Sequence, residues 1–313
     1  MGCPRAAGAH FGGPPAVIRA EVLGFCMGVR RAVGLARAEA ENARGRVYAI
    51  GPLIHNLQAL GELERLGVET LDEACLPCDM RGSSAIIRAH GVSPQIEGEL
   101  RGRGAAVVDA TCPRVKASQL RARAFAEAGF PLFLAGEKNH AEIAGILGYA
   151  EAGALAAGET CLPRAVAGGA GEARALAEKL RGGGWEKAAL IGQTTISEGE
   201  YRAIAAEIAA FFPGLEIAQT ICAATRERQD SLRGLFGRAD ALVVAGGRES
   251  ANARRLFAVA ESSGKPCVLA ETARDIPHEF FGFGAVGLAA GASTPDSVIE
   301  EIECALAAGA CRD

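Results

Sequence analysis

The sequence predicts an α/β protein made of three small domains with parallel sheets, related by an approximate threefold repeat. From Ala16 onward, short β-branched and apolar runs alternate with helical patterns, which is typical of parallel strands joined by helices. Three of these runs lead into a cysteine where a helix begins, at Cys26 (run 20–26), Cys112 (run 107–112) and Cys222 (run 215–222). Self-similarity of this kind indicates a repeated structural unit.

The elements after each cysteine recur at similar spacing. A second strand leads to a polar residue 29, 28 and 28 positions after the cysteine, namely His55, His140 and Ser250. A third strand in each unit also ends in polar residues, at His90, at Gln193 to Thr195, and at Ser293. We therefore expect lobes at 16–105, 106–214 and 215–313, after a disordered tail at 1–15.

Ligands of open parallel sheets bind beyond the carboxyl ends of the strands. If the three lobes direct these ends at a common centre, their polar residues meet there. The converging set would comprise Cys26, Cys112, Cys222, His55, His90, His140, Glu142, Gln193, Thr194, Ser250, Asn252 and Ser293. We predict one site that is assembled from all three lobes.

Composition excludes several classes of protein. Apolar residues make up 49% of the chain and the net charge is −4, so neither nucleic acid nor an anionic membrane is an expected partner. No apolar run has the length of a membrane span, and the first 15 residues lack the apolar core of a secretory signal. We expect a cytoplasmic protein, where cysteines more often bind metals or act in catalysis than form disulfides.

The repeated cysteines are candidate metal ligands. Thiolates select zinc or an iron–sulfur cluster, and structural zinc usually takes four ligands, often in close pairs. Three widely spaced cysteines fit a four-iron cluster better than a zinc site, with one iron of the cluster having no protein ligand. Cys75 and Cys78 form a Cys-x-x-Cys pair without a following helix, which indicates loop thiols. The remaining cysteines are interpreted as packing residues (Cys161, Cys267, Cys304 and Cys311) or, like His10, as incidental residues of the tail (Cys3).

The residues beside the thiols suit an anion with several oxygens. Histidines and hydroxyl or amide side chains at glycine-containing turns are typical of phosphate sites. Glu142 is the candidate proton donor, because Asp109 is the only other carboxylate near these strand ends. The alternative for Glu142 is a helix-start residue favoured by the helix dipole. No dinucleotide-binding motif is complete, so electrons for a reducible cluster would come from outside.

Seven segments resemble the 4-hydroxy-3-methylbut-2-enyl diphosphate reductase family, whose members catalyse the last step of the non-mevalonate isoprenoid pathway. The resemblance covers about residues 17–308 and preserves the order and spacing of the segments. They are Gly-Phe-Cys-Met-Gly-Val (24–29), Ile-His-Asn (54–56), Ala-His-Gly-Val-Ser (89–93), Asp-Ala-Thr-Cys-Pro (109–113), His-Ala-Glu (140–142), Gln-Thr-Thr (193–195) and Gly-Ala-Ser-Thr-Pro-Asp (291–296).

The resemblance implies a three-lobed α/β fold around a 4Fe-4S cluster held by Cys26, Cys112 and Cys222. It implies reductive loss of the 4-hydroxyl from the allylic diphosphate, giving isopentenyl and dimethylallyl diphosphates, with electrons from a ferredoxin or flavodoxin. Glu142, with Thr194 and His140, would deliver protons near the open iron. The substrate would be bound by His55, His90, His140, Thr194, Ser250, Ala251, Asn252 and Ser293.

This chain departs from the family pattern at a few positions. Ala141 replaces a usual proline, Ala251 replaces the second serine of a usual Lys-Asn-Ser-Ser-Asn run, and 221–225 lacks the commoner aromatic residue. Because alanine at position 251 lacks the serine hydroxyl, diphosphate binding is expected to be weaker by about 1 kcal/mol. An iron–sulfur hydro-lyase acting on another small anionic substrate remains an alternative, which a requirement for reductant would separate. An iron–sulfur sensor is disfavoured by the acidic charge balance.

Overall fold

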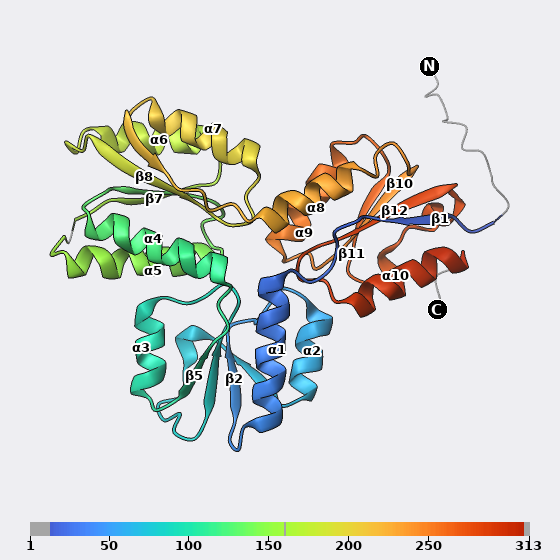
Figure 1. The fold of residues 1–313 in the computed structure, drawn as a ribbon, viewed down its shortest axis with the longest axis horizontal. Coiled ribbons are helices and arrows are strands. Elements are labelled where there is room, and N and C mark those ends of the chain that lie inside the picture. Colours follow the sequence, from blue (N-terminus) through green and yellow to red (C-terminus); the bar gives the residue numbers. More distant parts are fainter. Residues whose placement is uncertain (1–12, 160, 310–313) are drawn as a thin grey trace. The chain divides into compact units, whose positions relative to one another are not determined.

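The computed structural model describes residues 13–159 and 161–309. They form two compact units: unit 1 contains the described parts of Met1–Cys26 and Ala223–Asp313 with His55–Ala59, and unit 2 contains Met27–Ile54 and Leu60–Cys222. The described strands make three four-stranded parallel sheets, two in unit 2 and one in unit 1 (Figure 1). The predicted α/β class with three parallel sheets is confirmed. Within this part of the chain, no helix combines the length and apolar composition needed to cross a membrane.

The first lobe of unit 2 has the strand order β3-β2-β4-β5. Its strands are β2 (Val47–Ile50), β3 (Val68–Leu71), β4 (Ser84–Ile87) and β5 (Ala106–Asp109). The helices of this part of the chain are α1 (Met27–Asn42), α2 (Leu57–Arg65), α3 (Pro94–Gly102) and the 3₁₀ turn η1 (Glu73–Cys75). Ser93 caps α3 by accepting the N–H of Ile96, and Pro94 occupies the first turn, where its missing N–H costs nothing.

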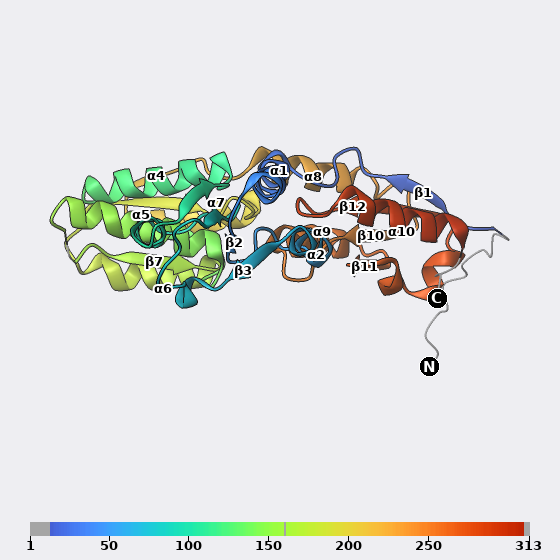
Figure 2. The ribbon, with the colours of Figure 1, turned by 90° about the horizontal axis from the view of Figure 1, so that it is seen from below.

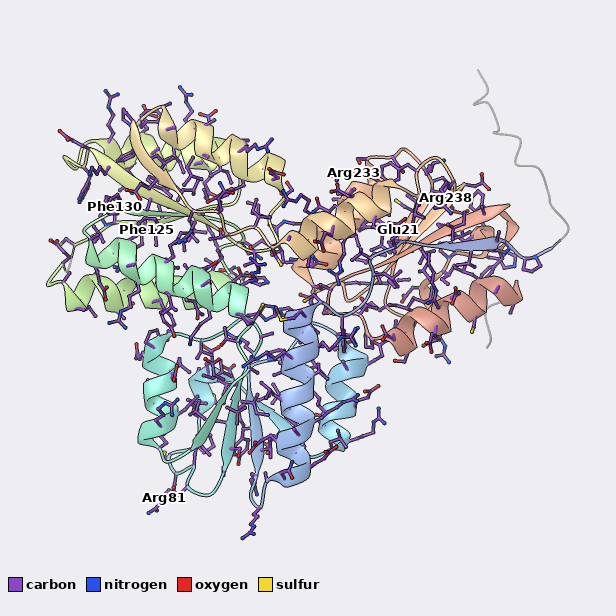
Figure 3. All side chains as sticks on the ribbon, in the orientation of Figure 1. Glu21, Arg81, Phe125, Phe130, Arg233 and Arg238 are labelled. Atoms are coloured by element: carbon purple, nitrogen blue, oxygen red, sulfur yellow. The ribbon has the colours of Figure 1, made fainter. Side chains whose placement is uncertain are left out.

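The second lobe of unit 2 repeats this order as β7-β6-β8-β9. Its strands are β6 (Leu132–Ala135), β7 (Arg164–Ala167), β8 (Lys187–Gly192) and β9 (Gly214–Ile217). Helices α4 (Pro113–Glu127) and α5 (Ala141–Ala156) cover one face, and α6 (Ala170–Arg181) and α7 (Glu198–Ala209) cover the other (Figures 1 and 2). Phe125 and Phe130 pack on the α4 side with ring centroids 5.6 Å apart (Figure 3). Because helices cover both faces, β6 is apolar at every position.

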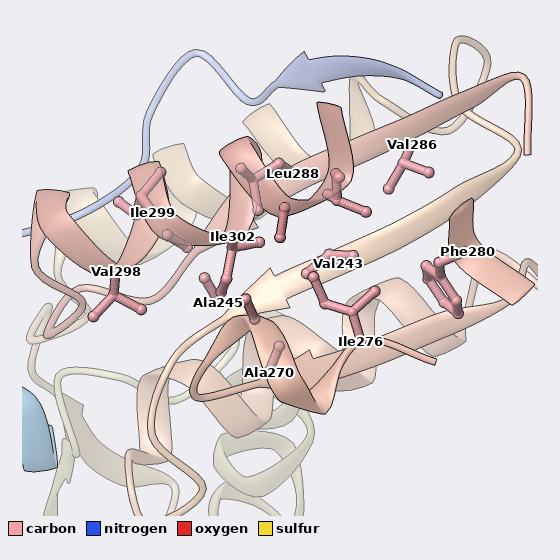
Figure 4. Packing of buried hydrophobic residues seen from close by; sticks show 14 of the residues in the cluster. Val243, Ala245, Ala270, Ile276, Phe280, Val286, Leu288, Val298, Ile299 and Ile302 are labelled. Carbon is pink, nitrogen blue, oxygen red and sulfur yellow. The ribbon is translucent and has the colours of Figure 1, made fainter. Parts of the chain in front are cut away.

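Unit 1 contains the third lobe, with the order β1-β12-β10-β11. Its strands are β1 (Ala16–Arg19), β10 (Ala241–Ala245), β11 (Cys267–Ala270) and β12 (Ala285–Ala290), and its helices are α8 (Ala223–Arg233), α9 (Ala251–Glu261), α10 (Asp296–Ala308) and the 3₁₀ turns η2 (Ala273–Asp275) and η3 (His278–Gly282). Alternate residues of β10 contribute to two cores. Val243 belongs to the core with Phe280 and Ile302 (Figure 4), whereas Val244 packs with Leu256 on the opposite face.

The pairing of the strands differs from the predicted lobe boundaries. Each strand that precedes a cysteine forms a sheet edge: β1 pairs with β12, β5 with β4 and β9 with β8. Residues 106–109 and 214–217 therefore complete the first and second sheets instead of opening the next lobe, and residues 16–19 join the third sheet. A single helix joins the strands of each pair: α3 joins β4 to β5, and α7 joins β8 to β9. Strands connected by such a crossover usually lie side by side.

The prediction of a strand over residues 20–26 is wrong. The strand in this region is β1, which ends at Arg19, and the following segment is irregular as far as Cys26. Gly24 has a φ of +77°, which is incompatible with an extended strand and strained for other residues. A Cβ atom at Gly24 would also lie 3.0 Å from Asp296 Oδ1, so the segment turns tightly against the start of α10.

Candidate functional site

The three repeated cysteines occupy equivalent positions in the fold. Each directly precedes a helix (α1, α4 or α8) and is partly exposed. The backbone N–H of each cysteine donates to the carbonyl oxygen two residues after the end of the neighbouring strand, which is β12, β4 or β8. The acceptors are the carbonyl oxygens of Ala292 for Cys26 (3.0 Å), Ala89 for Cys112 (2.9 Å) and Thr194 for Cys222 (2.9 Å). The predicted repeat therefore extends to individual hydrogen bonds.

In unit 2, the thiol of Cys112 lies directly against Gly28. A Cβ atom at Gly28 would be 2.5 Å from Cys112 Sγ and 3.0 Å from its Cβ, closer than side-chain carbons normally approach. The bare backbone of Gly28 therefore makes room for the sulfur itself, which any larger residue would displace. A partly exposed thiol suits a metal ligand better than a fully buried core cysteine.

The second polar position of each repeat is also preserved. His55, His140 and Ser250 each lie five residues after the end of β2, β6 and β10, respectively. His140 caps α5, because its Nδ1 accepts the N–H of Glu142 (3.1 Å), and Ser250 caps α9 by accepting the N–H of Ala253 (3.4 Å). In the first repeat the cap shifts by one residue to Asn56, whose Oδ1 accepts the N–H of Ala59 (2.9 Å).

Glu142 and Thr194 form a buried pair in unit 2. The Glu142 side chain accepts the Thr194 N–H at Oε1 (2.6 Å) and the Thr194 hydroxyl at Oε2 (2.9 Å), and Glu142 is only 1% exposed. The carbonyl of the same Thr194 accepts the N–H of Cys222. The alternative of a helix-dipole role does not account for these bonds, because both carboxylate oxygens bond to another element. A buried carboxyl group is thus connected through one residue to a candidate ligand.

The two histidines of unit 2 lie edge to face. The ring centroids of His90 and His140 are 5.1 Å apart and the rings are perpendicular. Sequence reasoning missed Gln119, which is fully buried on α4 and whose amide would lie 2.7 Å from a Cβ at Gly145. Among the residues that the structure describes, neither polar atom of this amide has a hydrogen-bond partner. A single glutamine on a helix gives no signal of this kind in the sequence.

The remaining substrate candidates gather at the strand ends of unit 1. Ser293 Oγ lies 3.2 Å from the His55 carbonyl oxygen and 3.3 Å from Ser250 Oγ. Asn252 Oδ1 accepts the N–H of Ala292 (2.9 Å), next to Ser293. Ser250, Ala251, Asn252 and Ser293 are all buried. These contacts form a polar site where β10 and β12 end and α9 begins.

Each unit therefore brings together part of the predicted set. Unit 2 contains Cys112, Cys222, His90, His140, Glu142, Gln193 and Thr194, and unit 1 contains Cys26, His55, Ser250, Ala251, Asn252 and Ser293. Assembly of both sets into one site stays a prediction.

The other cysteines were predicted only in part. Cys75 and Cys78 are exposed and no helix follows them directly, as expected, but Cys75 ends the 3₁₀ turn η1 and only Cys78 lies in a loop. The packing interpretation is wrong for Cys161, which precedes β7 in a loop, and for Cys304, which lies on the exposed side of α10. Cys267 is half-buried in the edge strand β11, and burial raises the pKa of its thiol. Cys3, His10 and Cys311 lie outside the described residues, as does most of the predicted tail.

Comparison with known proteins gives consistent matches over nearly the whole chain. The family model described as LytB protein matches residues 17–307. A protein of Treponema denticola named 4-hydroxy-3-methylbut-2-enyl diphosphate reductase is 45% identical over 301 residues, covering 94% of this chain and 99% of its own. A protein of Aquifex aeolicus with the same name is 36% identical, covering 92% of this chain and 94% of its own.

Solved structures show the same fold. One, described as (E)-4-hydroxy-3-methyl-but-2-enyl diphosphate reductase, the terminal enzyme of the non-mevalonate pathway, aligns with a TM-score of 0.68 and 35% identity, covering 93% of this chain and 98% of that chain. The E-1-hydroxy-2-methyl-but-2-enyl-4-diphosphate reductase from Plasmodium falciparum aligns with a TM-score of 0.82 and 24% identity, covering 96% of this chain and 91% of that chain. The second similarity concerns the fold alone.

Proposed function

Because the chain belongs to the LytB family, we propose that it converts (E)-4-hydroxy-3-methylbut-2-enyl diphosphate to isopentenyl and dimethylallyl diphosphates. The reaction adds two electrons and two protons to the substrate and releases the 4-hydroxyl oxygen as water. The protein has to accept electrons, protonate the departing hydroxyl and bind the diphosphate. The names of the relatives support the substrate, and the buried Glu142–Thr194 pair is the observation that carries the chemistry.

We propose that Cys26, Cys112 and Cys222 hold a 4Fe-4S cluster with one open iron. Three thiolates are the soft ligands that such a cluster requires, and all three cysteines are partly exposed, so their sulfurs are accessible to it. When bound, the cluster would supply the stored electron and a Lewis-acidic iron. The electrons would arrive singly from a ferredoxin or flavodoxin, since the sequence has no complete dinucleotide motif.

Glu142 and Thr194 are assigned to proton delivery. In the observed geometry the Thr194 hydroxyl donates to Glu142 Oε2. When Glu142 is protonated, this bond reverses: the carboxylic acid donates to Thr194 Oγ1, whose own hydrogen then turns toward the substrate. The Thr194 N–H holds the other carboxylate oxygen in place throughout. The pair therefore transfers a proton without moving either backbone.

The diphosphate is assigned to the polar strand ends. Because α9 begins at Ala251, the N–H groups of Ala251 and Asn252 have no acceptor within the helix and favour an anion. The hydroxyls of Ser250 and Ser293 rotate and can donate to phosphate oxygens. His140 accepts a hydrogen bond at Nδ1, which places the proton of the neutral ring on Nε2. His55 and His90 are assigned to the same anion-binding set, as ring N–H donors.

The Glu142→Gln variant tests the assignment of the acid. Gln keeps the size of Glu142 but cannot transfer a proton, so we expect normal iron and sulfide content and turnover lower by about 10²–10⁴-fold. Glu151→Gln, on the exposed side of the same helix α5, is the matched control and should retain full activity. The assay uses anaerobically purified protein, the allylic diphosphate and reduced methyl viologen. Full activity of Glu142→Gln would remove Glu142 from this role.

The same preparation separates the reductase from a hydro-lyase. A reductase consumes two electrons for each substrate molecule and has no turnover without reductant, whereas a hydro-lyase turns over in its absence. Turnover of the allylic diphosphate by a colourless, iron-free preparation would contradict the cluster itself.

A further inference from the structure

Helices α1 and α4 are cationic over most of their length, and their carboxylates lie only in the last turns, at Glu39, Glu41 and Glu127. Residues 26–38 include Arg30, Arg31 and Arg37, and residues 110–126 include Arg114, Lys116, Arg121 and Arg123, although the whole chain has a net charge of −4. A helix N-terminus carries partial positive charge and favours acidic residues in the first turn, yet neither helix has one there. The positive potential at the starts of these two helices is therefore not neutralised by their own first turns.

Within the part of the chain that the structure describes, three of these cations have no acidic partner. Lys116 pairs with Asp109 (3.0 Å), Arg37 with Glu62 (2.7 Å) and Arg123 with Glu127 (2.7 Å). Among the described residues, no carboxylate pairs with the exposed guanidinium groups of Arg30, Arg114 and Arg121. These three charges are therefore available to a partner.

Arg31 connects the two helices. Its guanidinium donates to the carbonyl oxygens of Thr111 (3.2 Å) and Asp109 (3.1 Å), the residues that lead into α4. The starts of α1 and α4 consequently lie side by side in unit 2, as Figures 1 and 2 also show. Exposed apolar side chains accompany the charges: Met27 is 59% and Leu120 is 52% exposed. We call this surface the basic face and define it as Met27, Arg30, Arg31, Arg114, Leu120 and Arg121.

The basic face borders a proposed cluster ligand. Cys112 immediately precedes α4, it is partly exposed, and Gly28 of α1 covers its Sγ with backbone alone. The bonds to the carbonyl oxygens of Thr111 and Asp109 account for Arg31. They do not explain the exposed arginines that extend two turns along α4 to Arg121, nor the apolar residues between them.

We propose that the basic face is where the electron donor docks, and that this donor is a one-electron carrier protein with an acidic surface. The inference rests on the proposed function, because a reductase of this kind receives its two electrons in two separate docking events. Opposite charge steers the encounter, and Met27 and Leu120 supply the apolar contacts at the centre of a short-lived complex. Docking here brings the carrier to the side of the fold where Cys112 lies under a single glycine.

The test compares two charge-reversed pairs with the same change in net charge. Arg30→Glu/Arg114→Glu alters the basic face, and the control Arg44→Glu/Arg181→Glu alters exposed arginines after the end of α1 and at the end of α6. Turnover of the allylic diphosphate is measured with a reduced acidic ferredoxin and, separately, with reduced methyl viologen. Binding of oxidised ferredoxin is measured by calorimetry. Arg30→Gln/Arg114→Gln should give an intermediate result.

We expect the basic-face pair to lower kcat/KM for ferredoxin by about tenfold or more at low ionic strength, with a smaller effect at high salt. Its turnover with methyl viologen and its iron content should equal those of the wild type, and the control pair should behave as wild type with both reductants. Equal losses in the two pairs, an equal loss with methyl viologen, or unchanged ferredoxin binding would each overturn the docking site. If the wild type is inactive with methyl viologen, the proposed function itself fails, and calorimetry alone then decides the docking site.

Discussion

Replacing Gly28 by alanine tests whether the close approach of the Gly28 backbone to Cys112 is required for the cluster. The added Cβ would be 2.5 Å from Cys112 Sγ, roughly 1 Å closer than the about 3.5–4.0 Å of a normal contact. Overpacking of this size typically costs about 1–3 kcal/mol. The better helix propensity of alanine offsets up to about 1 kcal/mol of this cost. Gly34→Ala is the matched control, because Gly34 lies on the same helix and its Cβ would meet nothing within 4 Å.

We expect Gly28→Ala to be less stable than Gly34→Ala by about 1–3 kcal/mol in urea unfolding of the apoprotein. Iron and sulfide content should fall in Gly28→Ala alone, because the ligand sulfur has to move away from its position. In a Cys112→Ala background the sulfur is absent, so most of the stability difference should disappear. Equal stability of the two glycine variants, with full cluster content in both, would refute the steric reasoning.

Three further predictions concern single side chains. Ala251→Ser adds a hydroxyl at the start of α9. It should lower KM for the diphosphate about fivefold in steady-state kinetics, which is equivalent to about 1 kcal/mol of binding free energy. Gln119→Met removes a buried amide that has no partner among the described residues and should raise the free energy of unfolding by about 1 kcal/mol; a lower stability would show that the amide is satisfied. Burial raises the pKa of the Asp109 carboxyl, but the hydrogen bonds from Thr111 and Lys116 outweigh this effect and hold the pKa below its ordinary value. The stability that Asp109 contributes is therefore complete above the ordinary carboxyl pKa and is lost as the pH falls through the lower pKa of the folded protein. Asp109→Asn should therefore flatten the stability profile below about pH 4, which acid unfolding followed by circular dichroism measures; an unchanged profile would contradict the shift.

The sequence predicted the existence of three parallel sheets better than it predicted which strands belong to each sheet. The central strands β2, β6 and β10 and their neighbours β4, β8 and β12 lie where apolar runs predicted them, because strands buried on both faces are continuously apolar. The edge strands β3, β7 and β11 were not predicted, since four residues such as Val-Glu-Thr-Leu (68–71) have too short a pattern to identify a strand. Pairing was not predicted either, because an apolar run does not specify which neighbour it will join.

Some residues of the candidate site can be identified from the sequence, whereas others can be identified only from their contacts in the folded protein. Polar residues at strand ends could be found from their spacing, and Glu142 from being almost the only carboxylate among them. Gly28 and Gln119 could not, since the importance of each depends on a side chain from another element that contacts it. Residues that act through close approach have no signature of their own in one sequence.

The repeat explains why only one lobe supplies an acid. The residue two positions after His55, His140 and Ser250 is Leu57, Glu142 and Asn252, respectively. Glu142 Oε1 accepts the Thr194 N–H and Asn252 Oδ1 accepts the Ala292 N–H, so the same hydrogen bond recurs at the same register in two lobes. Only in the second lobe does the donor residue carry a hydroxyl, which binds the other carboxylate oxygen. The same backbone hydrogen bond is thus kept in both lobes, and only in the second lobe do a carboxylate and a threonine hydroxyl add the bond on which the proposed proton route depends.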